Sequence, residues 1–317
     1  MKRSIEQITK PSIPTSIVML VGCLVLWLPD FLSPGDSVEC GGMMIPYVPA
    51  TLLCVMLTIA CGVGLSLLLF KLYVTRTRSV FATFIYILTV SCVPLLHTQV
   101  EAHVCALLYV GFVVSLLGMY KDAHAVKSAY NAGLLLAVLA LFEPYFLLLI
   151  PFWQIGIMMQ RSWSLRTFLA SVLGMLTTAV LVGWGCYFMQ IEMSYGWEEL
   201  SVRGWSVDTP AFCQWLVWCV FLLWIIVLLY LKIFSYSIKS RMVMNVMLLL
   251  SSAMLVLSFL TAMNATFVVC CMVTCLMYVV QWAHSNQSSF FIWINLAVYG
   301  AILALIYISG IFGYGMA

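Results

Sequence analysis

Eleven long apolar stretches follow one another along this chain, separated by short polar segments. A helix of about 20 apolar residues crosses a bilayer core of about 30 Å, and these stretches have 15 to 27 residues. They lack the apolar–polar alternation typical of a membrane β-barrel. We therefore predict an all-α polytopic membrane protein with transmembrane helices at residues 13–32, 47–73, 80–96, 104–120, 128–142, 145–159, 165–191, 210–233, 242–263, 265–282 and 290–312.

The composition excludes a water-soluble or disordered chain. Hydrophobic side chains make up 64% and charged side chains 8%, whereas soluble domains carry about a quarter charged residues. The longest polar segment, residues 192–209, is too short to fold alone. We expect a single transmembrane domain over residues 1–317. No glycine-rich phosphate loop, nucleophile elbow or nucleic-acid motif occurs, so we expect no cofactor and no nucleic-acid partner.

The basic residues predict the orientation of the chain. If the N-terminus is cytoplasmic, 13 of the 14 lysines and arginines fall on the cytoplasmic side, and only Arg203 falls outside. Nine of the eleven acids fall outside, which this rule does not require. Because eleven crossings reverse the side, we expect the C-terminus outside. We interpret the first apolar stretch as an uncleaved helix, since no small-residue cleavage site follows it.

Three acids lie at or in the first outer loop: Asp30, Asp36 and Glu39. Acids there could bind a metal, or accept a proton from a sugar hydroxyl as a general base. The alternative is a solvated turn, which Pro34, Gly35 and Asp36 favour. The same loop holds Cys40, which an oxidising compartment could bring into a disulfide. Most other cysteines fall inside predicted spans, where they pack as small apolar residues.

The next outer loop carries His97, Glu101 and His103 within seven residues. Such groups can hold a divalent ion or relay protons. Their spacing matches no zinc motif, so we predict no metal site and interpret them as residues lining a cavity.

Glu143 lies between the two shortest spans, of 15 residues each. At about 1.5 Å per residue each reaches about 22 Å, so we expect this turn below the outer surface. One interpretation is a carboxylate presented to a ligand or a proton. The other is a local helix cap, because Pro144 suits the first position of the next helix.

Two further features complete the prediction. The loop at 192–209 places Trp197 and Trp205 around Arg203, as in a helix lying on the membrane surface. Pairs of small residues, at Gly62 with Ser66 and in the segment 310–313, predict close contacts between helices.

One block resembles known families. It comprises YNAG at 130–133, LALFEP at 139–144, SLR at 164–166 and LG at 173–174. This block resembles a domain-of-unknown-function family of multi-span bacterial inner-membrane proteins. It is also similar to polytopic glycosyltransferases of the C-type fold, which use polyprenyl-phosphate sugar donors. The chain departs from them in its short first outer loop of 17 residues and in having Arg203 as its one outer basic residue.

The resemblance implies a protein of the bacterial inner membrane that acts in cell-envelope glycan or lipid-linked sugar metabolism. Asp30, Asp36 or Glu39 would then be the general base. Glu143, Asn131, His97, Glu101, His103 and Arg203 would line the cavity. Its partners would be membrane lipid and a polyprenyl-phosphate-linked sugar. Two alternatives stay open: a non-catalytic membrane subunit with a protein partner, and a small-molecule transporter.

Overall fold

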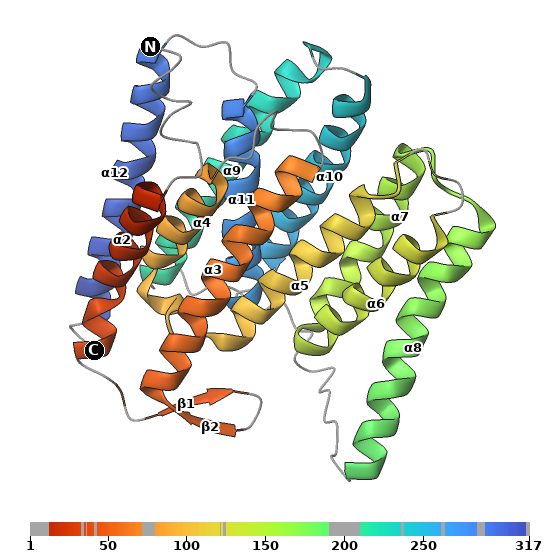
Figure 1. Cartoon of the computed structure of the whole chain (residues 1–317), viewed down its shortest axis with the longest axis horizontal. Coiled ribbons are helices and arrows are strands. Elements are labelled where there is room, and N and C mark those ends of the chain that lie inside the picture. The colour runs from red at the N-terminus through yellow and green to blue at the C-terminus, as the bar shows by residue number, and fades with distance from the viewer. Residues whose placement is uncertain are drawn as a thin grey trace.

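The computed structural model describes residues 13–32, 35, 37–40, 43–71, 80–120, 122, 125–189, 210–235, 238–260, 264–283 and 289–314. They form a helical bundle with one short hairpin (Figure 1). The elements are α2 (Ile13–Leu32), β1 (Ser37–Cys40), β2 (Met43–Pro46), α3 (Tyr47–Lys71), α4 (Phe81–Ser91), η1 (Pro94–Leu96), α5 (Val100–Leu117), α6 (Val126–Phe142), η2 (Pro144–Leu148), α7 (Leu149–Met159), α8 (Leu165–Met189), α9 (Pro210–Lys232), η4 (Ile233–Ser235), α10 (Ile238–Leu260), α11 (Asn264–Ala283) and α12 (Ser289–Tyr314).

The predicted helical class is confirmed. Within the described part of the chain, four helices are long and apolar enough to cross a membrane: Tyr47–Phe70 in α3, Val100–Leu117 in α5, Leu165–Phe188 in α8 and Ser240–Ser258 in α10. Each is apolar around most of its circumference, as lipid or a buried core requires. The chain therefore has the character of a membrane protein.

Helix α11 forms the centre of the bundle. All fifteen side chains from Thr266 to Val280 are buried, and the helix contacts α4, α5, α9 and α10. Helix α8 lies at one edge, where α6 provides its main contact (Figure 1). Many apolar side chains of α8 are exposed, Trp184 and Leu181 among them. The two helices show the two environments of apolar residues in a membrane bundle: a protein core and a lipid-facing surface.

Prolines interrupt two of the predicted spans. The expected helix at 80–96 ends at Ser91, and Pro94 then opens the 3-10 turn η1. Val93 is extended (φ −115°, ψ 90°), because the ring of a following proline disfavours the helical conformation. The expected helix at 145–159 likewise begins with η2 and becomes α-helical only at Leu149. The boundaries of these two spans were therefore predicted wrongly.

The segment between α2 and α3 contains regular structure that we did not predict. Strands β1 and β2 pair antiparallel, with Ser37 opposite Pro46 and Cys40 opposite Met43. Two glycines separate the strands in the sequence, and such a pair between short extended runs is a known hairpin signal. The hairpin leads directly into α3.

The close contact predicted at Gly62 and Ser66 is confirmed. A Cβ on Gly62 would lie 3.1 Å from the Thr83 side chain, so α4 approaches α3 closely here. The Thr83 hydroxyl donates to the Gly62 carbonyl at 2.9 Å and contacts the Ser66 hydroxyl at 2.7 Å. Small residues let the two backbones approach, and hydroxyl groups then link them.

Candidate acid–base site at the hairpin end

The end of the bundle that carries the hairpin brings Asp30 and His97 together, although they lie 67 positions apart. Asp30 is in the last turn of α2, and His97 directly follows η1. Oδ2 of Asp30 lies 2.5 Å from Nδ1 of His97. The histidine side chain is 1% exposed and the aspartate side chain 19%. Of the two groups, the carboxylate is the one that an incoming molecule can reach.

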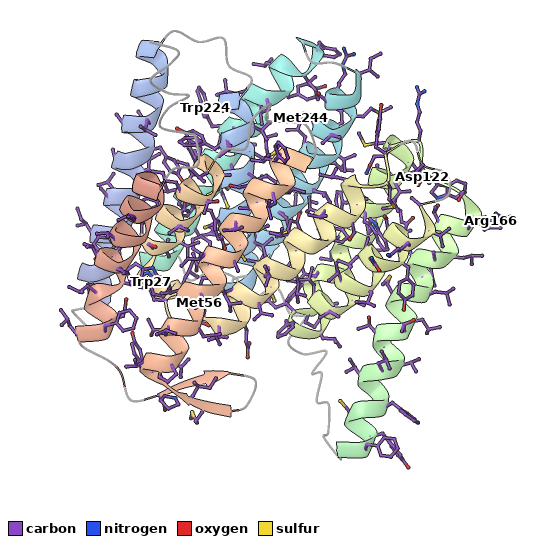
Figure 2. The ribbon with its side chains drawn as sticks, in the orientation of Figure 1. Trp27, Met56, Asp122, Arg166, Trp224 and Met244 are labelled. Atoms are coloured by element: carbon purple, nitrogen blue, oxygen red, sulfur yellow. The ribbon has the colours of Figure 1, made fainter. Side chains whose placement is uncertain are left out.

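Three neighbouring side chains fix this pair. The Tyr47 hydroxyl, from the first position of α3, donates to Oδ1 of Asp30 at 3.1 Å. The Trp27 indole stacks on the His97 ring, with centroids 3.9 Å apart and planes at 17°. Its Nε1 donates to the Ser91 hydroxyl at 2.8 Å. Trp27 lies one turn before Asp30 on the same face of α2, toward the hairpin end of the bundle (Figure 2). The carboxylate and the imidazole are therefore held in one geometry.

Both ring nitrogens of His97 have an acceptor within hydrogen-bond distance. Nε2 is 3.2 Å from the backbone carbonyl oxygen of Ser91, and Nδ1 faces the Asp30 carboxylate. The imidazole is therefore held by two contacts, one of them to the carboxylate.

Helix α12 also reaches this site. The Tyr307 hydroxyl donates to the Leu26 carbonyl at 3.5 Å, one turn before Asp30. Helices α2, α3 and α12 and the turn η1 thus surround one carboxylate, and only the folded bundle assembles it.

His103 has a different environment from His97. Its side chain is fully buried, Nε2 lies 3.0 Å from the Leu96 carbonyl, and Nδ1 lies 3.3 Å from the Thr58 hydroxyl of α3. It ties α3 and α5 to the end of η1, which indicates a structural role.

Glu143 carries a buried carboxylate, and its side chain does not cap the following helix. It has extended backbone (φ −141°, ψ 112°), and no capping hydrogen bond joins it to η2, although Pro144 occupies the expected first position. Instead the Thr266 hydroxyl, from the start of α11, donates to Oε2 at 3.0 Å. Only 8% of Glu143 is exposed. The carboxylate links α6 to the central helix.

This contact yields a stability prediction. We expect Thr266→Val, which preserves shape but removes the donor, to lower the free energy of unfolding by about 1.5–3 kcal/mol, the usual contribution of a hydrogen bond to a charged group. The matched control is Thr177→Val, because that hydroxyl bonds to the Leu173 carbonyl in its own helix. SDS titration of both variants in detergent measures the difference. Equal stabilities would mean that Thr266 does not support Glu143.

Two of the remaining predicted residues lie on the surface of the described structure. Glu101 is exposed in the first turn of α5, and Asn131 is exposed on α6. Glu39 and Cys40 belong to β1, but their side chains fall outside the described part of the structure. Asp36, Arg203 and the whole loop at 192–209 also fall outside it. Among the described residues, no three His, Cys, Asp or Glu side chains group as a metal site requires.

Four residues that position the acids escaped the sequence analysis: Trp27, Tyr47, Ser91 and Thr266. Hydroxyl and aromatic residues are common in apolar helices, so their presence carries little signal. The spacing of Trp27 and Asp30, one helical turn apart at the end of a predicted span, was the clue available.

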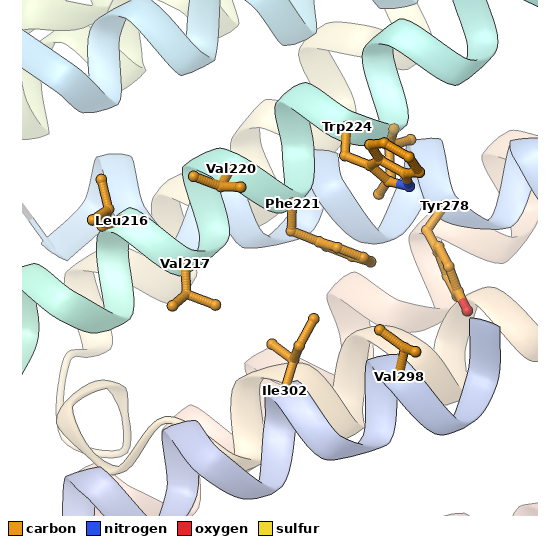
Figure 3. A pocket seen from close by; sticks show the side chains of 9 residues that line it. Leu216, Val217, Val220, Phe221, Trp224, Tyr278, Val298 and Ile302 are labelled. Carbon is orange, nitrogen blue, oxygen red and sulfur yellow. The ribbon is translucent and has the colours of Figure 1, made fainter. Parts of the chain in front are cut away.

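A cavity of about 420 Å³ lies between α9, α11 and α12 (Figure 3). It is lined by Leu216, Val217, Val220, Phe221, Trp224, Ile225, Tyr278, Val298 and Ile302. None of the described candidate residues lines it, and its walls are almost entirely apolar. This chemistry fits a hydrocarbon chain better than a sugar.

Known proteins offer no guide to these sites. No family model, no curated protein and no solved structure matches the chain. The case for function therefore rests on the geometry of the site.

Proposed function

We propose that the protein crosses the bacterial inner membrane eleven times, with a cytoplasmic N-terminus and the Asp30 site at the outer surface. Eleven α-helices, α2 to α12, correspond one by one to the predicted spans in the described part of the chain. The orientation is supported by the basic residues, since it places 13 of the 14 lysines and arginines on the cytoplasmic side.

In this proposal Asp30 is a general base that removes a proton from an acceptor hydroxyl. The observation that supports this role is the environment of the carboxylate. Tyr47 and His97 orient it, yet 19% of the aspartate side chain is exposed. A base must lie within hydrogen-bond reach of the proton that it takes, and it works best when its geometry is fixed in advance. His97 is buried and both its nitrogens are engaged, so its role is to position Asp30.

The substrate class that we propose is a polyprenyl-phosphate-linked sugar. The acceptor oxygen would form a bond to the anomeric carbon while the bond from that carbon to the phosphate oxygen breaks, and polyprenyl phosphate would leave. The resemblance of the block at 130–174 to C-type-fold glycosyltransferases supports it, as does the position of an acid–base group at one end of an apolar bundle. A lipid-linked donor keeps its chain in the bilayer and presents its sugar at the membrane surface. Asp30 at the outer end of α2 is placed to meet an acceptor there.

The test uses the full chain in nanodiscs with a polyprenyl-phosphate hexose labelled in the sugar. We expect the wild type to transfer the label to an added acceptor or to water. We expect Asp30→Asn to lower turnover by about 10²–10⁴-fold, the usual contribution of a general base. Asp122→Asn is the matched control, because this exposed aspartate lies at the opposite end of the bundle (Figure 2). Full turnover by Asp30→Asn would refute the base, and no turnover by the wild type would refute the substrate class.

The contact between Asp30 and His97 favours proton-coupled transport as a second candidate. A carboxylate and an imidazole in contact are side chains that can relay protons. If Asp30→Asn abolishes proton-driven uptake of a solute into vesicles while the wild type leaves the labelled sugar intact, transport replaces transfer as the conclusion.

A further inference from the structure

The end of the bundle opposite Asp30 carries a group of exposed cations. Lys127 is in the first turn of α6, Arg166 is in the first turn of α8, and Arg161 lies between α7 and α8. All three are exposed, and the neighbouring Trp163 is 49% exposed. Asp122 lies at the same end of the bundle (Figure 2), so three described cations stand against this one acid in the segment 122–166 other than Glu143, which is at the opposite end.

The packing of α6 on α8 places two of these cations at a similar level. The helices begin at the same end of the bundle, because α7 returns the chain between them (Figure 1). They touch where Gly133 meets the backbone of Ser171. Lys127 lies six residues before this contact and Arg166 five, which places them about 9 Å and about 8 Å from it along their helices. Both residues therefore lie in the first turns of adjacent helices at similar depth.

Arg161 occupies a position where glycine is usual. It ends α7 with φ 58°, in the left-handed region. Its amide bonds to the Met158 carbonyl at 3.0 Å, and the Ser162 amide bonds to the Ile157 carbonyl at 3.3 Å, which together make a Schellman motif. A residue with a Cβ is strained there, and glycine is not. The fold alone would favour glycine, so the guanidinium points to a role outside the fold.

The surface next to these cations is apolar. Leu165, Leu169 and Leu173 of α8 are 67%, 50% and 55% exposed. The cations are therefore followed along α8 by a strip of exposed leucine side chains, with the Trp163 indole near the cations. An anionic lipid has the matching order: a charged headgroup, an interfacial region and acyl chains.

We propose that Lys127, Arg161 and Arg166 bind the phosphate-bearing headgroup of an anionic phospholipid, with its acyl chains along α8. Guanidinium groups suit phosphate oxygens because they donate two parallel hydrogen bonds. The general excess of bases on the cytoplasmic side explains positive charge at this end. It does not explain a strained arginine beside an exposed tryptophan. This site is separate from Asp30 and does not depend on the proposed function.

The test compares nanodiscs of phosphatidylcholine with nanodiscs that also contain phosphatidylglycerol. We expect native mass spectrometry to show phosphatidylglycerol retained by the wild type. Removing one cation, as in Arg166→Gln, should weaken retention about fivefold, the usual contribution of one basic residue at an anionic surface. Arg241→Gln makes the same charge change in a guanidinium that donates to the Phe234 carbonyl at 3.3 Å, and should retain the lipid as the wild type does.

Arg161→Gly separates binding from folding. It relieves the left-handed strain, so we expect a higher melting temperature in phosphatidylcholine together with weaker retention of phosphatidylglycerol. Greater stability with unchanged retention would overturn the proposal. Equal losses in Arg241→Gln and Arg166→Gln would also overturn it, since overall charge alone would then account for retention.

Discussion

Replacing Gly174 by alanine is expected to separate α8 from α6. A Cβ at this position would overlap the Tyr130 carbonyl oxygen and lie 2.9 Å from the Leu134 amide nitrogen. Both obstacles are backbone atoms of α6, which no rotamer change can move. Overpacking typically costs about 1–3 kcal/mol, and we expect about 3 kcal/mol or more here because the helices themselves must move apart. SDS titration, or melting followed with a thiol-reactive dye, measures the loss, since most described cysteines are free and buried.

Gly183→Ala provides the control on the same helix. No atom lies within 4 Å of a Cβ built there, so alanine should be neutral or raise stability by up to about 1 kcal/mol through helix propensity. Gly133→Ala should behave like Gly174→Ala, because its Cβ would overlap the Ser171 carbonyl oxygen. If Gly174→Ala were as stable as Gly183→Ala, the close crossing of α6 and α8 would be wrong.

These glycines also give a physical reason for the block that carries the resemblance. Gly133 and Gly174 stand at its two ends, and each backs onto the other helix. Asn131, which the resemblance implies for a cavity, is exposed on α6. Part of the block therefore serves helix packing, and the chemistry of the site comes from other segments.

Hydropathy was sufficient to predict where helices occur, because eleven apolar runs separated by polar loops allow few other folds. The breaks at Pro94 and Pro144 shifted boundaries without adding or removing an element. The hairpin Ser37–Pro46 was missed because its strands are only four residues long. The same loop also contains a second turn signal, at Pro34 and Gly35, besides the glycine pair.

The sequence did not predict which residues contact the acids. Sorting charges by side placed Asp30, His97 and Glu143 at one end of the bundle. It could not say that Asp30 meets His97, whereas Glu143 meets Thr266. Those pairings depend on how α2 and α11 pack beside the helix breaks. Hydropathy does not encode such neighbours when helices are far apart in the chain.

The second large effect is expected at His97. His97→Phe keeps a ring stacked on Trp27 but removes both nitrogens, so Asp30 loses its partner and the Ser91 carbonyl loses a donor. Removing one member of a largely buried pair leaves the other group desolvated without compensation. We expect a loss of about 2–4 kcal/mol in the free energy of unfolding. Asp30→Asn should cost less, because the amide oxygen still accepts from Tyr47.

The double variant tests whether the two residues act as a pair. When both are changed, no charge is left without its partner, so the combined loss should fall short of the sum by roughly 1–3 kcal/mol. Additive losses would show that Asp30 and His97 do not interact, whatever their separation. Asp30→Asn with Thr266→Val is the control cycle, since Asp30 contacts His97 whereas Thr266 donates to Glu143, and these two losses should add.

Turnover in the same variants distinguishes a positioning residue from a structural one. If His97 orients the base, His97→Phe still contains the Asp30 carboxylate, so folded protein should keep more activity than Asp30→Asn. Its loss should appear in kcat more than in KM, because orientation of the base matters chiefly in the transition state. A purely structural histidine would lower the folded fraction and leave kcat per folded molecule unchanged. The value of kcat per folded molecule therefore decides whether the buried imidazole contributes to the chemistry of the exposed carboxylate.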